Sequence, residues 1–168
     1  MKNILKYFKI VMILPFTVLV LVPLFILSFS KFDVADLNDV RLYLALAAFF
    51  IGASFVVAIV LIFAKDIKNG NINSLKDSPN LVITGPFAYV RNPMTMGVFM
   101  IIVGEAFFFG SIWVGVWALC FLAFNQWYLK RVEEPKLAAK FGHSYLEYYR
   151  NVPRWFPRTT PWKPRILE

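Results

Sequence analysis

Long stretches without charge constrain this chain more than any other feature of its sequence. Residues 10–30 and 42–64 contain no charged side chain. Each stretch is long enough for the roughly 20 residues that a membrane-spanning helix needs. The composition agrees, because 59% of the 168 residues are apolar and only 17% are charged, whereas about a quarter are charged in an average soluble domain. We therefore expect an all-α integral membrane protein.

A third apolar stretch, residues 93–128, has one charge, at Glu105. As a single helix it would extend about 54 Å, well beyond a hydrocarbon core of about 30 Å. We therefore predict a helical hairpin over residues 93–131 that turns near Phe109-Gly110-Ser111. With two anchor helices within residues 1–64, this makes four transmembrane helices in a single membrane domain of residues 1–168, with short cytoplasmic helices near the C-terminus and a core over residues 81–158.

The basic residues flank these stretches and predict the orientation of the chain. Three Lys and no acid precede the first stretch, nine Lys or Arg against four Glu follow Tyr128, and the hairpin tip carries no charge. By the positive-inside rule, both termini and the connection 65–92 lie in the cytoplasm. This accounts for most of the net charge of +8, so we expect contact with the membrane and none with nucleic acid.

Several catalytic signatures are absent from the sequence. There is no glycine-rich dinucleotide motif and no P-loop. The chain has one cysteine, Cys120, and one histidine, His143, so we expect neither an internal disulfide nor a metal site. Glu105 is the only ionisable residue within a predicted span, which makes it a functional candidate. Because it lies close to the hairpin tip, we favour a structural role.

Residues 81–93 form the first of two segments dense in turn and aromatic residues. Gly85-Pro86 predicts a turn, and Asn92 followed by Pro93 predicts the start of a helix. With Arg91 beside that helix N-terminus, exposed N–H groups, the positive end of the helix dipole and a guanidinium converge on one anion site. Alternatively, Asn92 and Pro93 only cap the helix while Arg91 reaches lipid phosphates.

Residues 133–157 form the second segment. Glu133 and Glu134 lie where the last predicted span leaves the membrane, on the side that is otherwise rich in cations. They are either solvated ion pairs or acids held by a specific partner. Gly142 predicts the end of a helix. Tyr145 and Tyr148 fit packing or interface positions better than a ligand cage.

Together the two segments resemble the isoprenylcysteine carboxyl methyltransferase family, whose wider group includes the phospholipid methyltransferases. The resemblance covers roughly residues 81–158 and rests on the order and spacing of four motifs around the hairpin. The motifs are Gly85-Pro86-Phe87-x-Tyr89-x-Arg91-Asn92-Pro93-Met94-x-x-Gly97, Glu133-Glu134-Pro135-x-Leu137, Phe141-Gly142-x-x-Tyr145-x-x-Tyr148 and Val152-Pro153-Arg154-Trp155.

The resemblance implies a methyltransferase that uses S-adenosyl-L-methionine, bound on the cytoplasmic side, and a lipophilic acceptor that enters from the bilayer. The cofactor carboxylate suits an arginine, its amine and hydroxyl groups suit carboxylates, and its sulfonium suits aromatic faces. The cofactor-binding candidates are Tyr89, Arg91, Asn92, Pro93, Gly97, Glu133, Glu134, Tyr145 and Tyr148. The candidates for orienting the acceptor during catalysis are Arg150, Asn151 and Arg154.

At three positions the chain departs from the eukaryotic enzymes of that family. It has Asn92 where they have His, Thr95 where they have Tyr, and Asn151 where they have Arg. Since that Arg is thought to orient a substrate carboxylate, the acceptor group stays open between a carboxylate, an amine and a thiol. The acceptor molecule could be an aminophospholipid, an isoprenoid or another amphiphile.

Two other classes of protein are compatible with the same sequence. One is a membrane reductase of the sterol-reductase type, which binds NADPH, and the other is a non-catalytic membrane subunit in which the two segments are interface caps. The methyltransferase interpretation depends on one structural prediction: the Arg91-Asn92-Pro93 corner and the Glu133-Glu134 pair fold together into one nucleotide-sized cavity.

Overall fold

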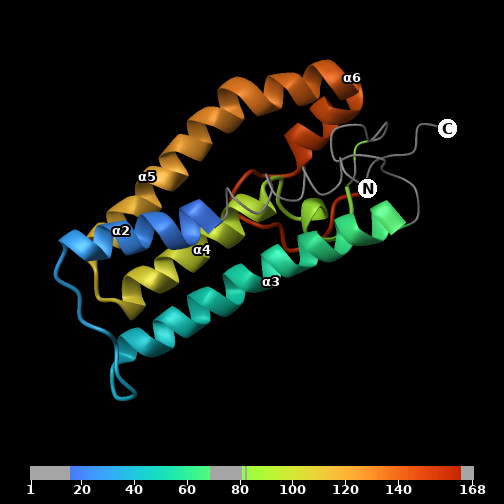
Figure 1. The fold of residues 1–168 in the computed structure, drawn as a ribbon. Coiled ribbons are helices and arrows are strands. Elements are labelled where there is room, and N and C mark those ends of the chain that lie inside the picture. The colour runs from blue at the N-terminus through green and yellow to red at the C-terminus, as the bar shows by residue number, and fades with distance from the viewer. Residues whose placement is uncertain (1–15, 69–80, 82, 164–168) are drawn as a thin grey trace. The chain divides into compact units, whose positions relative to one another are not determined.

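All regular structure in the described part of the chain is helical (Figure 1). The computed structural model describes residues 16–68, 81 and 83–163, and within these ranges there is no strand. The prediction of an all-α protein is therefore confirmed. The elements are the π-helix η1 (Thr17–Leu21), α2 (Val22–Phe29), α3 (Val40–Lys68), the 3₁₀-helix η2 (Gly85–Ala88), α4 (Pro93–Phe108), α5 (Ile112–Tyr128), the π-helix η3 (Leu129–Glu133) and α6 (Glu134–Asn151).

Two of the described helices are long and apolar enough to cross a membrane. They are Val40–Ile62 within α3, and the continuous run Ile112–Asn151 that joins α5, η3 and α6. Thr17–Phe29 and α4 are apolar but shorter. With its 16 residues, α4 extends about 24 Å against a hydrocarbon core of about 30 Å. Residues 10–15 of the first predicted span lie outside the described residues, so the four-span topology stays a prediction.

The run Ile112–Asn151 is apolar only in its first part. Its 40 residues would extend about 60 Å, twice the thickness of a hydrocarbon core. Charged residues begin at Lys130, whereas α5 contains none. The stretch suited to lipid is therefore α5, and we treat η3 and α6 as lying beyond it.

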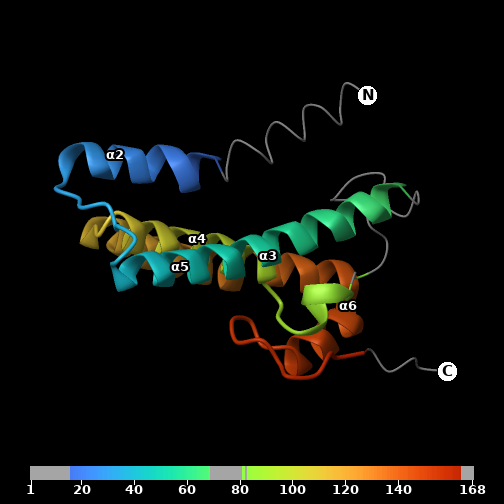
Figure 2. The same cartoon turned by 90° about the horizontal axis from the view of Figure 1, so that it is seen from below.

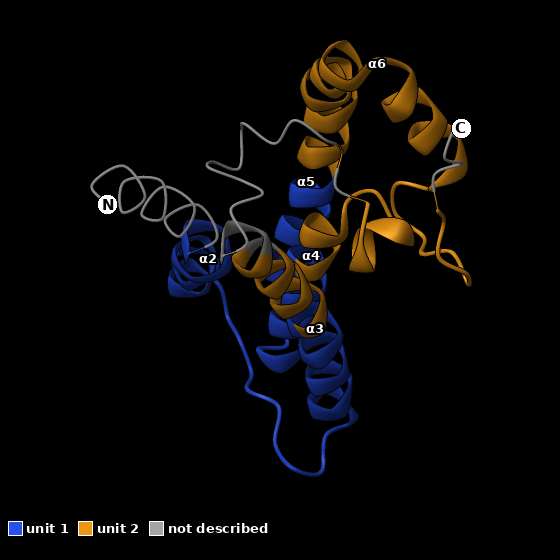
Figure 3. Ribbon diagram, turned by 90° about the vertical axis from the view of Figure 1, so that its right-hand side faces the viewer, with its two compact units in different colours: residues 1–53, 98–122 blue, residues 54–97, 123–168 orange. Residues whose placement is uncertain are grey.

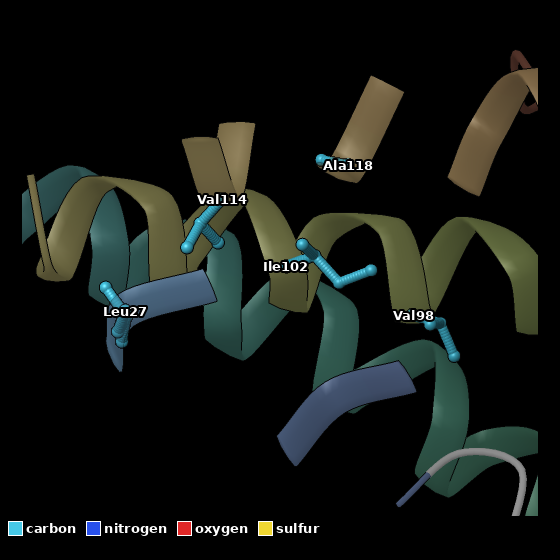
Figure 4. Close-up of a cluster of buried hydrophobic side chains, with 5 residues drawn as sticks. All are labelled: Leu27, Val98, Ile102, Val114 and Ala118. Atoms are coloured by element: carbon cyan, nitrogen blue, oxygen red, sulfur yellow. The ribbon is translucent and has the colours of Figure 1, made fainter. Parts of the chain in front are cut away.

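The chain divides into two compact units (Figure 3). Unit 1 comprises Met1–Ala53 and Val98–Leu122, and unit 2 comprises Ser54–Gly97 and Ala123–Glu168. In unit 1, buried apolar side chains from α2, α4 and α5 form one core cluster (Figure 4). Its buried members are Leu27, Val98, Ile102, Val114 and Ala118.

In unit 1, α4 packs against α3 at backbone distance. A Cβ added to Gly104 would lie 3.0 Å from the Ala45 carbonyl oxygen and 3.3 Å from the Phe49 nitrogen. Ala45 and Ala48 are themselves buried. Small residues at a helix crossing are the usual means by which membrane helices approach closely.

The turn between α4 and α5 lies at residues 109–111, where the sequence predicts it. Gly110 has a φ of +54°, a value that favours glycine. The segment before α3 is bound to this turn, since Asp33 N donates to Phe109 O at 3.0 Å and Ala35 N donates to Phe108 O at 2.8 Å. Arg41 forms ion pairs with Asp33 and Asp39 in the same region.

Each π-helix ends two residues before a proline, and the proline explains why the π-type hydrogen bonds stop there. In η1, Val22 N donates to Thr17 O. The π-type partner of the next carbonyl, Val18 O, would be Pro23, which has no N–H group. The indole nitrogen of Trp117 instead donates to Val18 O at 3.2 Å.

Unit 2 is held together by its C-terminal segment (Figure 2). Backbone hydrogen bonds join residues 88–91 to residues 153–162: Arg91 N donates to Pro153 O at 2.9 Å, Arg158 N to Tyr89 O at 3.0 Å and Trp162 N to Ala88 O at 2.9 Å. The buried side chains of Tyr145, Tyr148 and Val152 pack between these segments with Leu81 and Trp162. The two motif-bearing segments are therefore neighbours in the same unit.

Candidate functional site

The segment before α4 places Arg91 in a fixed position. Gly85 begins η2 with a φ of +57°, and a Cβ there would lie 2.5 Å from the Ile62 Cδ1 atom. The chain then leaves η2, and α4 starts at Pro93, which is fully buried. Met96 N donates to Asn92 O at 3.2 Å, so Asn92 occupies the position directly before the helix, as predicted.

The two consecutive glutamates have different environments. Glu134 is 8% exposed, whereas Glu133 is among the exposed residues. Neighbouring helical residues project about 100° apart, so the two side chains point in different directions. Partial loss of water raises the pKa of the Glu133 carboxyl, and the Glu134 carboxylate raises it further against a smaller lowering by Lys136. The pair is therefore one buried acid and one surface acid.

Glu134 is bound by two arginines. Arg91 Nη1 donates to Glu134 Oε1 at 2.8 Å. Arg154 donates from Nε to Oε1 at 3.0 Å and from Nη2 to Oε2 at 2.6 Å, which is the bidentate geometry of strong guanidinium–carboxylate pairs. All three side chains are only 10–12% exposed. This Arg91–Glu134–Arg154 cluster carries one net positive charge in a largely water-excluded place.

Gln126, at the end of α5, binds Arg154 of the cluster. Its Oε1 atom accepts hydrogen bonds from Arg154 Nη1 and from the Trp155 indole nitrogen, both at 2.8 Å. All three guanidinium nitrogens of Arg154 are thus bound to protein oxygens. Our sequence interpretation missed Gln126. The available signal was an amide in the last turn of an apolar helix, a place where polar side chains tend to face protein.

Arg91 has a buried donor without a partner and an aromatic neighbour. Its guanidinium lies 4.1 Å from the ring centroid of Tyr149, a cation–π distance. Its Nε atom is buried and has no hydrogen-bond partner among the described residues. Buried donors without a partner are rare because they cost free energy. This unpaired N–H group suits an additional acceptor such as the carboxylate of a ligand.

Tyr145 and Tyr148 are buried beside the cluster. The Tyr148 hydroxyl donates to Phe87 O at 2.9 Å, and burial raises its pKa. Burial also raises the pKa of Tyr145 to about 12, with a further rise from Glu134 and an opposing effect of Arg91. Both phenols are therefore protonated and neutral at pH 7. Their positions agree with the packing role that the sequence favours.

The remaining predicted residues lie in three different places. Tyr89 is half-buried in the turn after η2, and Gly97 is buried in α4. Arg150 and Asn151 lie at the end of α6, where they line a cavity of about 590 Å³ together with residues of the C-terminal segment. Neither Arg91 nor Glu134 lines this cavity. The structure therefore brings Arg91, Glu134 and Arg154 into contact and places Arg150 and Asn151 at a separate cavity.

Three features of the cluster favour an anion. It has a net positive charge, an unpaired buried N–H group and the start of α4 next to Arg91; a helix N-terminus also favours anions. In the described ranges no three His, Cys, Asp or Glu side chains come together as a metal ion requires.

Comparison with known proteins gives one match. A family model described as phospholipid methyltransferase matches residues 40–144 of this chain. No match was found among curated proteins or among solved structures. The matched range begins with α3 and extends into α6, so it includes both Arg91 and Glu134.

Proposed function

Because this chain belongs to the phospholipid methyltransferase family, we propose that it transfers a methyl group from S-adenosylmethionine to a lipophilic or amphiphilic acceptor at the membrane interface. The family implies a methyltransferase that acts on a lipid-like substrate. The choice of cofactor, the acceptor group and the site are our proposal, and they rest on the residues of unit 2.

One observation carries the proposal: the 2.8 Å contact between Arg91 and Glu134. It joins the two segments that resemble membrane methyltransferases, although Arg91 and Glu134 are 43 residues apart in the chain. The residues present fit S-adenosylmethionine. Its carboxylate matches the unpaired Nε donor of Arg91, and its positive sulfonium matches an aromatic face such as that of Tyr89. When bound, the cofactor supplies an electrophilic methyl group.

In this proposal each side chain either binds the cofactor or orients a residue that binds it. Arg91 and the start of α4 hold the cofactor carboxylate, while Glu133 and Glu134 face its amine or hydroxyl groups. Arg154 and Gln126 keep Glu134 in place. Supporting roles are proposed for residues that flank Arg91 in the chain or lie in α6: Tyr89, Asn92, Pro93, Gly97, Tyr145 and Tyr148. Catalysis is then mainly the alignment of acceptor, methyl group and sulfur where water is scarce.

The acceptor contacts are proposed for Arg150 and Asn151, which line the cavity at the end of α6. Arg154, the third candidate, is already committed to Glu134 and Gln126, so we give it a positioning role. A carboxylate acceptor would need no base, whereas an amine or thiol must lose a proton.

The same proposal includes the membrane arrangement predicted from charge. Four helices cross the bilayer, both termini and the connection 65–92 lie in the cytoplasm, and the cluster lies on that side. The two helices of spanning length and composition support it.

A binding titration tests the proposed function. The full chain is purified in detergent and titrated with S-adenosylhomocysteine. We expect binding that Arg91→Lys weakens about tenfold or more, because the substitution keeps the charge but removes the guanidinium fork. The matched control is Arg131→Lys, an exposed arginine of η3, which should leave the affinity unchanged. The absence of binding, or equal losses in both variants, would refute the proposal. Binding of NADPH alone would indicate the reductase instead.

A further inference from the structure

The second half of α6 has two faces with different functions. Beyond the kink at Gly142, where φ is +54° and ψ is −129°, one face buries Tyr145, Tyr148 and Val152 against the rest of unit 2. The other face lines the cavity of about 590 Å³, a volume typical of ligand sites. The residues that line this cavity are His143, Leu146, Glu147, Arg150, Asn151, Trp162 and Lys163.

The wall of this cavity is built by specific contacts. Trp162 N donates to Ala88 O at 2.9 Å, and the Trp162 ring packs on Tyr148 with centroids 5.8 Å apart. Arg158 Nη1 donates to Asn151 O at 2.6 Å, and within α6 Asn151 Nδ2 donates to Glu147 O at 2.8 Å. The C-terminal segment is therefore fastened to α6 through the Trp162 ring and through Arg158.

The charge of the cavity favours an anion. Arg150 and Lys163 contribute two positive charges and Glu147 one negative charge. The nearby arginines Arg91, Arg154 and Arg158 each donate to a protein oxygen. Within the part of the chain that the structure describes, Arg150 has no ion pair. An unpaired guanidinium with an ammonium group in the same cavity is a typical partner for a phosphate group.

The surroundings of the cavity favour a lipid as the source of that phosphate. Leu146 lines the cavity and is exposed, and the Trp162 ring belongs to the same lining. Apolar side chains in the lining of a polar cavity suit a molecule with a charged headgroup and an apolar tail.

We propose that this cavity binds the phosphate group of a lipid headgroup through Arg150 and Lys163. The assignment of this cavity to the acceptor lipid rests on the proposed function. Its assignment to a phosphate group rests on the cavity alone. Glu147 opposes the anion, so it limits the affinity for lipids with a net negative charge. Substitutions of Arg150 and Glu147 should therefore change the affinity for the phosphate group in opposite directions.

The test uses the full chain in detergent and short-chain lipids below their micelle concentration. The probes are dihexanoylphosphatidylglycerol, dihexanoylglycerol (the same tails without phosphate) and glycerol phosphate (the phosphate without tails). We expect the phosphatidylglycerol to bind about tenfold or more tightly than dihexanoylglycerol. We expect Arg150→Ala to abolish that preference and Glu147→Gln to increase it about threefold. Lys130→Ala, which removes an exposed cation of η3, should change nothing.

The outcomes distinguish a lipid headgroup from a free phosphate ester and show whether the cavity binds phosphate at all. Glycerol phosphate that binds as tightly as the lipid would assign the cavity to a free phosphate ester and overturn the lipid headgroup. Three results would overturn the phosphate site itself. The first is equal binding of the two lipids, the second is an equal effect of Arg150→Ala and Lys130→Ala, and the third is weaker binding after Glu147→Gln. Titration of Arg150→Ala with S-adenosylhomocysteine shows whether the variant is folded. If wild-type protein does not bind that ligand, the proposed function fails, while the lipid titration still decides the cavity.

Discussion

Arg91 and Glu134 form a largely buried ion pair with a distance of 2.8 Å between Nη1 and Oε1. Glu134 is shared with Arg154, so one carboxylate compensates two guanidinium groups. Such an arrangement is sensitive to the loss of the shared member, because both cations are then left without their partner in a place with little water.

Glu134→Ala should therefore destabilise the protein strongly, by about 3–5 kcal/mol, as expected when a buried ion pair loses one partner. Glu133→Ala should cost less than about 0.5 kcal/mol, since exposed side chains contribute little. Thermal unfolding of both variants in the same detergent measures the difference. Similar losses would show that the two glutamates share one environment.

Gln126 and Trp155 should be coupled through the hydrogen bond between them. Trp155→Phe removes one donor to Gln126 and keeps the ring, and we expect a loss of about 1 kcal/mol. Gln126→Leu removes the acceptor of two hydrogen bonds and should cost more. In the double variant the loss should be smaller than the sum, because the Trp155–Gln126 bond can be lost only once. Additive losses in unfolding measurements would contradict this contact.

Gly104→Ala should weaken the packing of α4 on α3 within unit 1. The new methyl group would lie 3.0 Å from the Ala45 backbone oxygen, and relief of such overpacking typically costs about 1–3 kcal/mol. Gly115→Ala is the control, because its Cβ would meet only the Ala106 Cβ at 3.9 Å, an ordinary contact. Thermal unfolding should therefore separate the two alanine variants. A destabilised Gly115→Ala or a neutral Gly104→Ala would argue against the close crossing.

The buried tyrosines should make the fold sensitive to alkaline pH. Burial raises the pKa of Tyr148, and the pKa of Tyr145 rises to about 12, while a tyrosine in the unfolded chain titrates near pH 10. Above about pH 10 the unfolded chain loses protons that the folded chain keeps, so the free energy of unfolding falls by up to about 1.4 kcal/mol per pH unit for each tyrosine.

Tyr148→Phe should therefore reduce this dependence. At pH 8 the variant should be less stable than the wild type, because it lacks the hydrogen bond to Phe87 O. The difference should shrink as the pH rises above 10. Unfolding measured from pH 8 to pH 11 checks the slope, and parallel curves for the two proteins would contradict the raised pKa of Tyr148.

Features that depend on neighbouring residues were predicted correctly from the sequence. The start of α4 at Pro93 and the turn at Gly110 each follow from the backbone preferences of one or two residues. At Gly142, where the sequence predicts the end of a helix, α6 leaves helical geometry and is kinked. The family resemblance likewise depends on the spacing of short motifs, and the match over residues 40–144 confirms it.

The long-range partners were not predictable in this way. Gln126 and Arg154 are 28 residues apart, and no local rule indicates that they meet. The sequence treats Glu133 and Glu134 as a pair, but the structure buries only one of them, because successive helical side chains point in different directions. The structure also places Arg150 and Arg154 in different surroundings, although the sequence offered them as equivalent candidates.

The sequence by itself therefore determined the helical class, the apolar stretches, the turns and the family, because hydrophobic length and local backbone preference are properties of neighbouring residues. Only the tertiary structure decided which arginine is committed to Glu134 and which is left free at a cavity. That choice depends on burial and on the direction of each side chain, and both arise when distant segments pack together.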